Sequence, residues 1–238
     1  MSVAKSRHFG TKKMNVDGFV DYGTDIISQQ SDKLVDHVLV FIFRPYHACW
    51  IQPIAVFATS GAAPTRILGQ IILRAIVSLH SVGAIVTSVV SDGAQTNKGV
   101  YKAFGINASI KDLKFSIEHP VDEKTKIFFM FDMPHIMKCI RNLIFNQKQV
   151  QFNEWLVLYK HLKSLYWLDK NYPIRYCFKL TKAHLYPNSW DKNEVAVQVL
   201  SDTTANRLAY YRDTLGVQEI IGSDDTEDML RLLNAAFV

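Results

Sequence analysis

The stretch "TSVVSDGAQTNKGVYKAFGI", residues 87–106, decides the fold that we expect for this chain. Its β-branched start is typical of a buried strand, and that strand ends in Asp92-Gly93. A short helix is predicted over 97–105, with Gly105 at its end. In an open α/β sheet, ligands bind over the carboxyl ends of the strands, so Asp92 stands at a candidate site.

The elements on either side of this stretch alternate between strands and helices. A helix is predicted over 62–83, with Pro64 near its start and Gly83 at its end. Short apolar runs predict strands over 17–24, 37–43, 51–59, 84–90 and 126–131. This order predicts the α/β class, with a mixed sheet flanked by helices. After about residue 145 the pattern becomes helical and rich in aromatic residues, which predicts two domains, 1–144 and 145–238.

Composition sets broad limits on function. The 238 residues carry a net charge of +5 and a pI near 9.0, which suits contact with a polyanion such as DNA. The three cysteines lie far apart and form no spaced Cys/His set, so a zinc finger is not expected. The longest apolar runs are too short or too interrupted to span a bilayer, so we expect no membrane partner.

Two carboxylates follow predicted buried strands, and each has two interpretations. Asp92 and Asp132 would both lie at strand ends, where oxygen ligands suit Mg²⁺. Alternatively, each caps the helix that follows, and Pro134 just after Asp132 is typical of a first helical turn. The residue pattern alone leaves both interpretations open.

A basic helix is predicted after Asp132. In "DMPHIMKCIRNLIF" the side chains of His135, Lys138 and Asn142 fall near one helical face, and Arg141 lies beside them. An apolar stripe accompanies them, made of Ile136, Ile140, Leu143 and Ile144. The cations suit phosphate contacts with DNA, or they form a solvated helix surface. The segment "GAQTNKG" lacks the spacing of a P-loop, so no phosphate loop is expected there.

Three segments together resemble a known family. "VVSDGAQTNKGVYKAFGI", "EHP" at 118–120 and "FDMPHIMKCIRNLIF" are similar to the catalytic-domain motifs of P-element-type transposases, which often carry a THAP zinc finger. The resemblance is densest over 85–145 and continues upstream through "GFVDYGT". Downstream, "NEVAVQVLSDTTANRLAYY" resembles more loosely the insertion domain of that family, which binds GTP.

The resemblance implies a fold, a chemistry and a setting. It implies an RNase H-like domain interrupted by a GTP-binding insertion domain, acting on DNA in the nucleus. Most of the first strand of such a sheet would precede Met1, so we expect exposed strand edges that favour self-association. The resemblance also implies Mg²⁺-dependent DNA cleavage and strand transfer, with the metal held by two Asp and one Glu. Asp92 matches the second Asp of that set and is the expected metal ligand. Asp132 matches the Asp-Pro-His motif and is expected to support the catalytic site from beside it.

Two members of the carboxylate set have no match in this chain. By the resemblance, the first Asp would precede Met1 and the Glu would follow the insertion domain, so we expect a transposase fragment that does not cut or join DNA. We likewise expect weak GTP binding or none. The glutamates in the second half are expected to be helix-surface charges: Glu154, Glu194, Glu219 and Glu227.

Two further hypotheses stay open. The chain could be a domesticated, non-catalytic DNA-binding or interaction protein, which salt-sensitive DNA binding without cleavage would support. It could also be an unrelated Mg²⁺-dependent phosphotransfer enzyme with Asp92 at a strand end, which metal-dependent phosphate release from small substrates would support.

Overall fold

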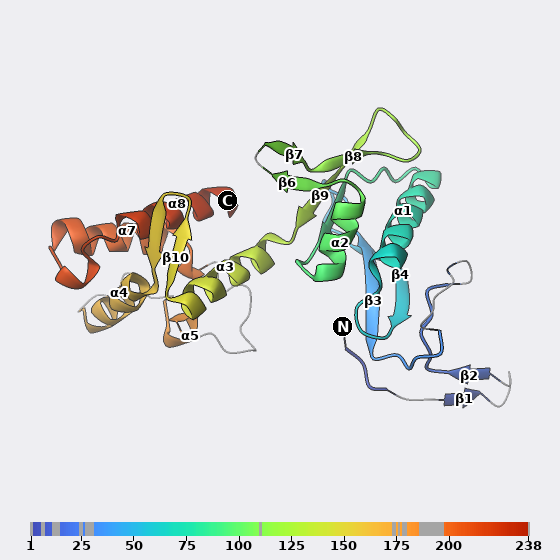
Figure 1. Cartoon of the computed structure of the whole chain (residues 1–238), viewed down its shortest axis with the longest axis horizontal. Helices are drawn as coiled ribbons and strands as arrows, with labels where there is room; N and C mark the ends of the chain where they lie inside the picture. Colours follow the sequence, from blue (N-terminus) through green and yellow to red (C-terminus); the bar gives the residue numbers. More distant parts are fainter. Residues whose placement is uncertain are drawn as a thin grey trace. The chain divides into compact units, whose positions relative to one another are not determined.

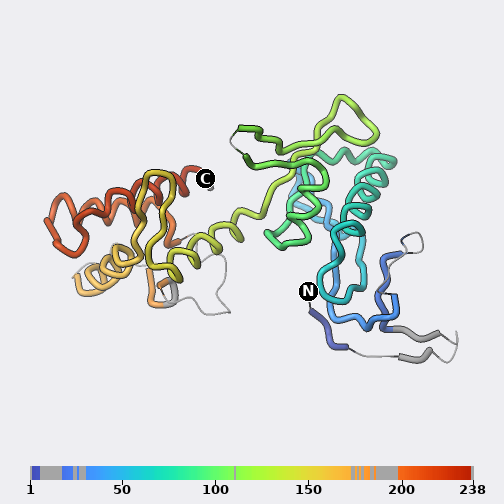
Figure 2. The backbone as a smooth tube through the Cα atoms, viewed as in Figure 1, coloured from blue at the N-terminus to red at the C-terminus, as the bar shows by residue number. Residues whose placement is uncertain are grey.

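The chain folds as two compact units. The computed structural model describes residues 2–5, 8–10, 15–23, 26, 31–109, 111–172, 175, 177, 180–185 and 198–237. The units are Met1–Met130 and Phe131–Val238 (Figure 1), and Figure 2 follows the backbone through both. This division lies earlier than the expected boundary at 144/145, because Met137 and Ile144 are already buried in the core of the second unit.

An antiparallel hairpin forms one sheet of the first unit. Strands β3 (His37–Phe43) and β4 (Gln52–Thr59) pair along their length, with one register irregularity between Phe41 and Ile42. Both strands match the predicted ranges to within one residue. A second, shorter antiparallel hairpin precedes them, made of β1 (His8–Gly10) and β2 (Asn15–Asp17).

The predicted strand over 17–24 does not form as one strand: Asp17 is the last residue of β2, and the described residues 18–23 form no strand. Asp21 instead makes an isolated bridge to Ala58, through a pair of backbone hydrogen bonds of 2.9 and 3.2 Å. Gly18 and Gly23 have φ values of 106° and 89°, which interrupt the extended backbone at both ends of the segment. The prediction of a continuous strand is therefore wrong, and pairing of the described residues 18–23 is limited to the isolated bridges Phe19–Leu34 and Asp21–Ala58.

Helix α1 (Thr65–Ser81) confirms the predicted helix over 62–83. Pro64 occupies the N-cap position, and Gly83, with a φ of 82°, follows the last turn. Phe57 of β4 and Ile71 of α1 line the same cavity, so the helix faces this strand. Its buried side is aliphatic and consists of Ile67, Leu68, Ile71, Ile72 and Ile76.

A second sheet of the first unit contains the strand that precedes Asp92. Its strands lie in the order β5-β9-β8, and β8 pairs with β9 in antiparallel fashion. Strand β5 is shorter than predicted, whereas β9 matches the predicted 126–131. The elements are β5 (Ser88–Ser91), α2 (Gln95–Ala103), the hairpin β6 (Asn107–Ser109) and β7 (Asp112–Lys114), β8 (Ser116–Glu118) and β9 (Lys126–Phe131).

Helix α2 packs on one face of strand β9. The Phe129 ring centroid lies 5.1 Å from that of Tyr101 and 5.4 Å from that of Phe104. On the opposite face of the strand, Phe128 and Met130 are 39% and 45% exposed. Figure 1 shows α2 beside β9, with the β6–β7 hairpin following the helix. The α/β class expected for this unit is confirmed.

The second unit is mostly helical, as expected, but it also contains a hairpin that the periodicity did not predict. Strands β10 (Gln149–Phe152) and β11 (Trp155–Leu158) pair in antiparallel fashion within a region expected to be helical. Lys148 and Asn153 have positive φ values, 62° and 52°. These conformations end the preceding helix and turn the chain between the two strands.

The helices of the second unit pack around one hydrophobic core. Leu165 of α4, Leu208 of α7 and Leu230 of α8 are fully buried in it. In the described residues, no helix is long and apolar enough to cross a membrane. The described elements are α3 (Met133–Gln147), α4 (Tyr159–Asn171), α5 (Lys182–Leu185), α7 (Asp202–Ala209), the π-helix Tyr210–Thr214, the 3₁₀ helix Gln218–Ile220 and α8 (Asp224–Phe237).

Candidate functional site

Asp92 lies in the loop that joins β5 to α2. Its Oδ1 atom accepts hydrogen bonds from the backbone N–H of Ala94 at 3.0 Å and from Nδ2 of Asn97 at 2.7 Å. The N-cap position of α2 is Ala94, which makes no side-chain cap. Asp92 therefore shapes the turn before the helix without occupying the cap position, and both of these hydrogen bonds are made by Oδ1.

The buried Tyr101 joins the end of β5 to α2 and β9 through hydrogen bonds. The hydroxyl of Tyr101 donates to the carbonyl of Met130 at 2.8 Å and accepts from the Ser91 hydroxyl at 2.9 Å. Tyr101 is 4% exposed, and burial raises the pKa of its hydroxyl. Because Ser91 precedes Asp92 directly, these bonds hold the backbone of the candidate ligand.

A divalent cation fits this loop through a single carboxylate. An exposed oxygen atom with no hydrogen-bond partner is the type of ligand that Mg²⁺ prefers, and Oδ2 of Asp92 has that character. Among the described residues, no three His, Cys, Asp or Glu side chains gather closely enough to hold a metal together. The described part of the chain therefore offers one ligand of a metal site.

Asp132 caps helix α3, as one of its two interpretations predicted. It occupies the N-cap position of α3, and its Oδ2 accepts from the backbone N–H of His135 at 3.2 Å. Pro134 lies in the first turn, as the Asp-x-Pro-His pattern suggested. The support that Asp132 was expected to lend to a catalytic site is a separate role and stays a prediction.

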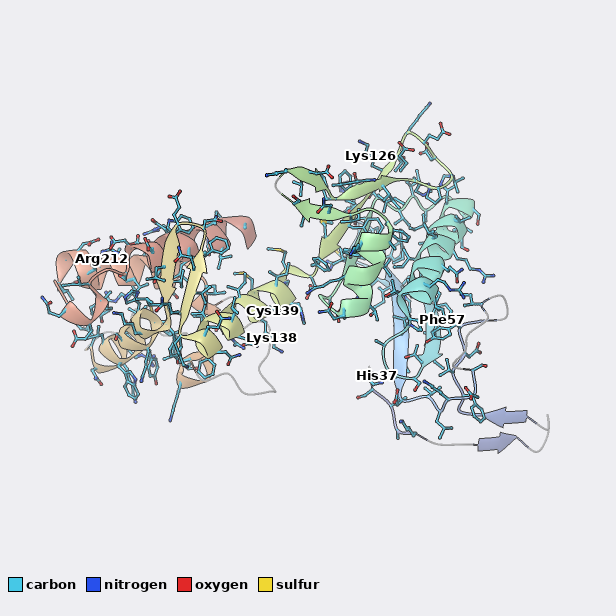
Figure 3. The ribbon with its side chains drawn as sticks, in the orientation of Figure 1. His37, Phe57, Lys126, Lys138, Cys139 and Arg212 are labelled. Carbon is cyan, nitrogen blue, oxygen red and sulfur yellow. The ribbon has the colours of Figure 1, made fainter. Side chains whose placement is uncertain are left out.

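The basic residues of α3 do not share one environment. His135 and Lys138 are partly exposed, whereas Arg141 is only 3% exposed and lies in the buried face between Met137 and Ile144. Figure 3 labels Lys138 on this helix. The predicted apolar stripe is also only partly right, because Leu143 is 42% exposed.

Arg141 is held by its chain neighbour. Its Nη2 and Nε atoms donate to Oδ1 of Asn142 at 2.8 and 3.2 Å. A phosphate contact needs an accessible guanidinium, and Arg141 is 3% exposed here. Its expected contact with DNA stays a prediction. Asn142 is partly exposed, but its carbonyl oxygen is already occupied by this arginine.

A buried ion pair lies in the second unit, at residues that the sequence did not single out. Asp169 is 1% exposed, and its Oδ1 lies 3.3 Å from Nε of Arg207. Its Oδ2 accepts from the backbone N–H of Cys177 at 3.1 Å. The Arg207 guanidinium lies over the Tyr211 ring, 4.3 Å from its centroid, and Nη2 donates to the Tyr211 hydroxyl. The sequence patterns did not indicate this cluster, because Asp169 and Arg207 lie far apart along the chain and on different helices.

A second buried polar contact joins α4 to α8. Nδ1 of His161 lies 2.9 Å from Oγ1 of Thr226, and His161 is fully buried. Burial lowers the pKa of His161 to about 4, and the nearby charge of Lys160 acts in the same direction. His161 is therefore a neutral core residue at pH 7.

The predicted surface glutamates lie at different places. Glu154 and Glu219 are exposed, as expected, and Glu194 lies outside the described residues. Glu227 is instead in an ion-pair network, because its carboxylate lies 2.8 Å from Nη2 of Arg212 and 2.7 Å from Nη2 of Arg231. It stabilises the start of α8.

Comparisons with known proteins match both units. Residues 1–105 match the family model described as TNP-like, RNase H N-terminal domain, and residues 134–238 match TNP-like, GTP-binding insertion domain. The chain is 26% identical over 232 residues to the DNA transposase THAP9 of Homo sapiens, covering 94% of this chain and 24% of that protein. It is 29% identical over 221 residues to the Transposable element P transposase of Drosophila melanogaster, covering 91% and 27%.

A solved structure matches over the whole chain. It is the Drosophila P element transposase strand transfer complex, with a TM-score of 0.76 and 26% sequence identity. The match covers 100% of this chain and 48% of that one. The chain thus spans about a quarter of the length of the curated relatives that it matches.

Proposed function

The chain belongs to the P-element-type transposase family, and we propose that its first unit contributes to a Mg²⁺-dependent site for DNA cleavage and strand transfer. In this proposal Asp92 is a metal ligand. The relatives are DNA transposases by name, and the matched structure is a strand transfer complex. DNA is therefore the proposed substrate, and the nucleus is the proposed location.

The observation that carries this proposal is the state of the Asp92 carboxylate. Two donors hold Oδ1, while Oδ2 has no hydrogen-bond partner among the described residues, and Asp92 is exposed. A carboxylate that serves only to shape a turn needs one oxygen, so the second oxygen is available to a cation. When bound, a divalent ion supplies charge neutralisation at phosphate oxygens. The role of Asp92 is to hold that ion at the end of β5.

Metal binding by this chain tests the proposal. We expect the purified protein to bind Mn²⁺, used as a spectroscopic substitute for Mg²⁺, and we expect Asp92→Asn to lose most of that binding. Asp112→Asn is the matched control, because Asp112 is also exposed and also contacts an asparagine five residues away. Equal Mn²⁺ binding by the wild type and Asp92→Asn, or no binding by the wild type, would overturn the proposal.

We propose Asp132 as a supporting residue only. Its cap on α3 uses one carboxylate oxygen and sets the direction of the helix that follows. Asp132→Asn keeps an acceptor for the His135 N–H, so it separates capping from any need for charge. We expect Asp132→Asn to fold normally, and a lower DNA affinity or activity in that variant would assign a role to the charge.

A second candidate function is non-catalytic DNA binding. The partly exposed His135 and Lys138 on α3 and the net charge of +5 favour it. Its signature is weak, sequence-independent DNA binding that falls with salt, without metal-dependent nicking of supercoiled DNA. Metal-dependent nicking or strand transfer that disappears in Asp92→Asn would instead assign catalysis to this chain.

GTP is the proposed ligand class of the second unit, from the match to a GTP-binding insertion domain. The described residues assign no contact to it, and we expect weak binding by this chain. Titration with a fluorescent GTP analogue and competition by GTP, but not ATP, tests this ligand.

A further inference from the structure

We infer that Asn97 is a positioning residue that orients the Asp92 carboxylate for a cation. The inference rests on the proposed role of Asp92 as a metal ligand. Nδ2 of Asn97 donates to Oδ1 of Asp92 at 2.7 Å, and it also lies 3.4 Å from the carbonyl oxygen of Asp92. One amide group therefore contacts both the side chain and the backbone of the same residue.

The donors around Asp92 converge on a single oxygen. The Ala94 N–H and the Asn97 amide both reach Oδ1, so the carboxylate cannot rotate without breaking two hydrogen bonds. These two bonds fix the orientation of the carboxylate and leave Oδ2 outside both of them. Without Asn97, the carboxylate would keep only the hydrogen bond from the Ala94 N–H and could rotate more freely.

Asn97 projects from a firmly packed part of α2. A Cβ atom built on Gly99 would lie 2.6 Å from Oγ1 of Thr65, so α2 approaches the start of α1 closely at this point. Val100 is fully buried, and Tyr101 bonds to the end of β9. A side chain on such a helix positions its partner more closely than one on a loop.

The chemistry of the amide suits this task. A lysine or arginine at this position would neutralise the carboxylate and compete with a cation for it. An amide N–H supplies direction without net charge, so Asp92 keeps its full negative charge toward the open side. Hydrogen bonds from outer residues to metal ligands commonly matter for affinity in this manner.

The experiment measures Mn²⁺ affinity and stability separately in the 238-residue chain. Mn²⁺ binding is followed by water-proton relaxation, and the melting temperature is recorded in EDTA. We expect Asn97→Ala and Asn97→Leu to raise the Mn²⁺ dissociation constant by about tenfold. Both substitutes are better helix formers than asparagine, so the melting temperature in EDTA should change by no more than about 2 °C.

A matched control comes from the neighbouring hairpin. Asn107 contacts Asp112 across the same sequence distance, with Nδ2 lying 3.5 Å from Oδ2. We expect Asn107→Ala to leave the Mn²⁺ dissociation constant unchanged. An unchanged constant in both Asn97 variants, with binding still lost in Asp92→Asn, would overturn the inference and leave the proposed function standing. Failure of the wild type to bind, or full binding by Asp92→Asn, would overturn both.

Discussion

The Tyr101 hydroxyl lies 2.8 Å from the carbonyl oxygen of Met130 and so joins helix α2 to strand β9. The same hydroxyl receives a hydrogen bond from Ser91, the residue before Asp92. One side chain thus connects the end of β5, the middle of α2 and the end of β9. These hydrogen bonds help to fix the position of Asp92, the candidate metal ligand, which follows Ser91.

Removing that hydroxyl should destabilise the first unit. In Tyr101→Phe the ring stays, but the Met130 carbonyl loses this donor and the Ser91 hydroxyl keeps only its 3.1 Å contact with the Asp92 carbonyl. We expect a loss of about 1–3 kcal/mol in the free energy of unfolding, measured by urea denaturation. Tyr46→Phe is the control, because Tyr46 also bonds to a serine, Ser88, but is 73% exposed. Equal effects of the two changes would contradict the assigned role of Tyr101.

Removing only one partner of the Asp169–Arg207 ion pair should lower the free energy of unfolding strongly. Arg207→Met removes the nearer of two arginines beside the Asp169 carboxylate, which is 1% exposed and keeps Nε of Arg175 at 3.9 Å. We expect a loss of up to about 3–5 kcal/mol. Asp169→Asn combined with Arg207→Met should recover part of that loss, because the buried charge is then gone. Urea denaturation of the two single variants and the double variant measures the coupling.

A more exposed arginine provides the comparison for Arg207, and its partner Glu227 keeps a second arginine, Arg212. Arg231 is 42% exposed and contacts Glu227 four residues earlier. We expect Arg231→Met to cost less than about 1 kcal/mol. A similar cost at Arg207 would mean that the Asp169 charge is solvated and not buried.

His161 should make the second unit less stable below neutral pH. Its pKa in the folded protein is about 4, below the ordinary value near 6.5, so the unfolded chain binds a proton first. The stability that neutral His161 allows is complete above pH 6.5 and falls as the pH decreases toward 4. The total loss over this range is up to roughly 3 kcal/mol.

The fluorescence of Trp155 and Trp167 can follow that unfolding as a function of pH. His161→Phe should flatten the dependence between pH 6.5 and 4, because no group at this position then takes up a proton. Carboxylates whose pKa is lowered, such as Asp122 and Asp213, contribute mainly below this range. An unchanged pH dependence in His161→Phe would assign the effect to another group.

Lys138 and Arg141 should respond differently to substitution. If Lys138 contacts a phosphate, Lys138→Gln lowers the slope of log affinity against log salt by about one. Lys163→Gln on α4 makes the same charge change at an exposed position and is the control. Arg141→Gln should reduce stability instead, because Arg141 is buried. An unchanged slope in Lys138→Gln would place Lys138 on a solvated face.

Local patterns predicted much of the first unit. The aliphatic spacing in α1, with Pro64 before it and Gly83 after it, defined that helix to within a few residues. The apolar run over 126–131 matched β9. These signals are local, since helix ends and strand periodicity depend on neighbouring residues. The hairpin β10–β11 was missed because positive φ values at Lys148 and Asn153 are not visible as a change in hydrophobic period.

By itself, the sequence determined the α/β class, the two-part organisation, the family resemblance and the candidacy of Asp92. Tertiary structure decided which polar groups meet. Helical spacing placed Arg141 beside Lys138, but packing of the second unit buries Arg141 and leaves Lys138 partly exposed. Asp169 and Arg207 lie on different helices, and only the shared core brings them within 3.3 Å. The physical reason is that burial and ion pairing depend on which helices pack together, which the spacing along a single helix does not specify.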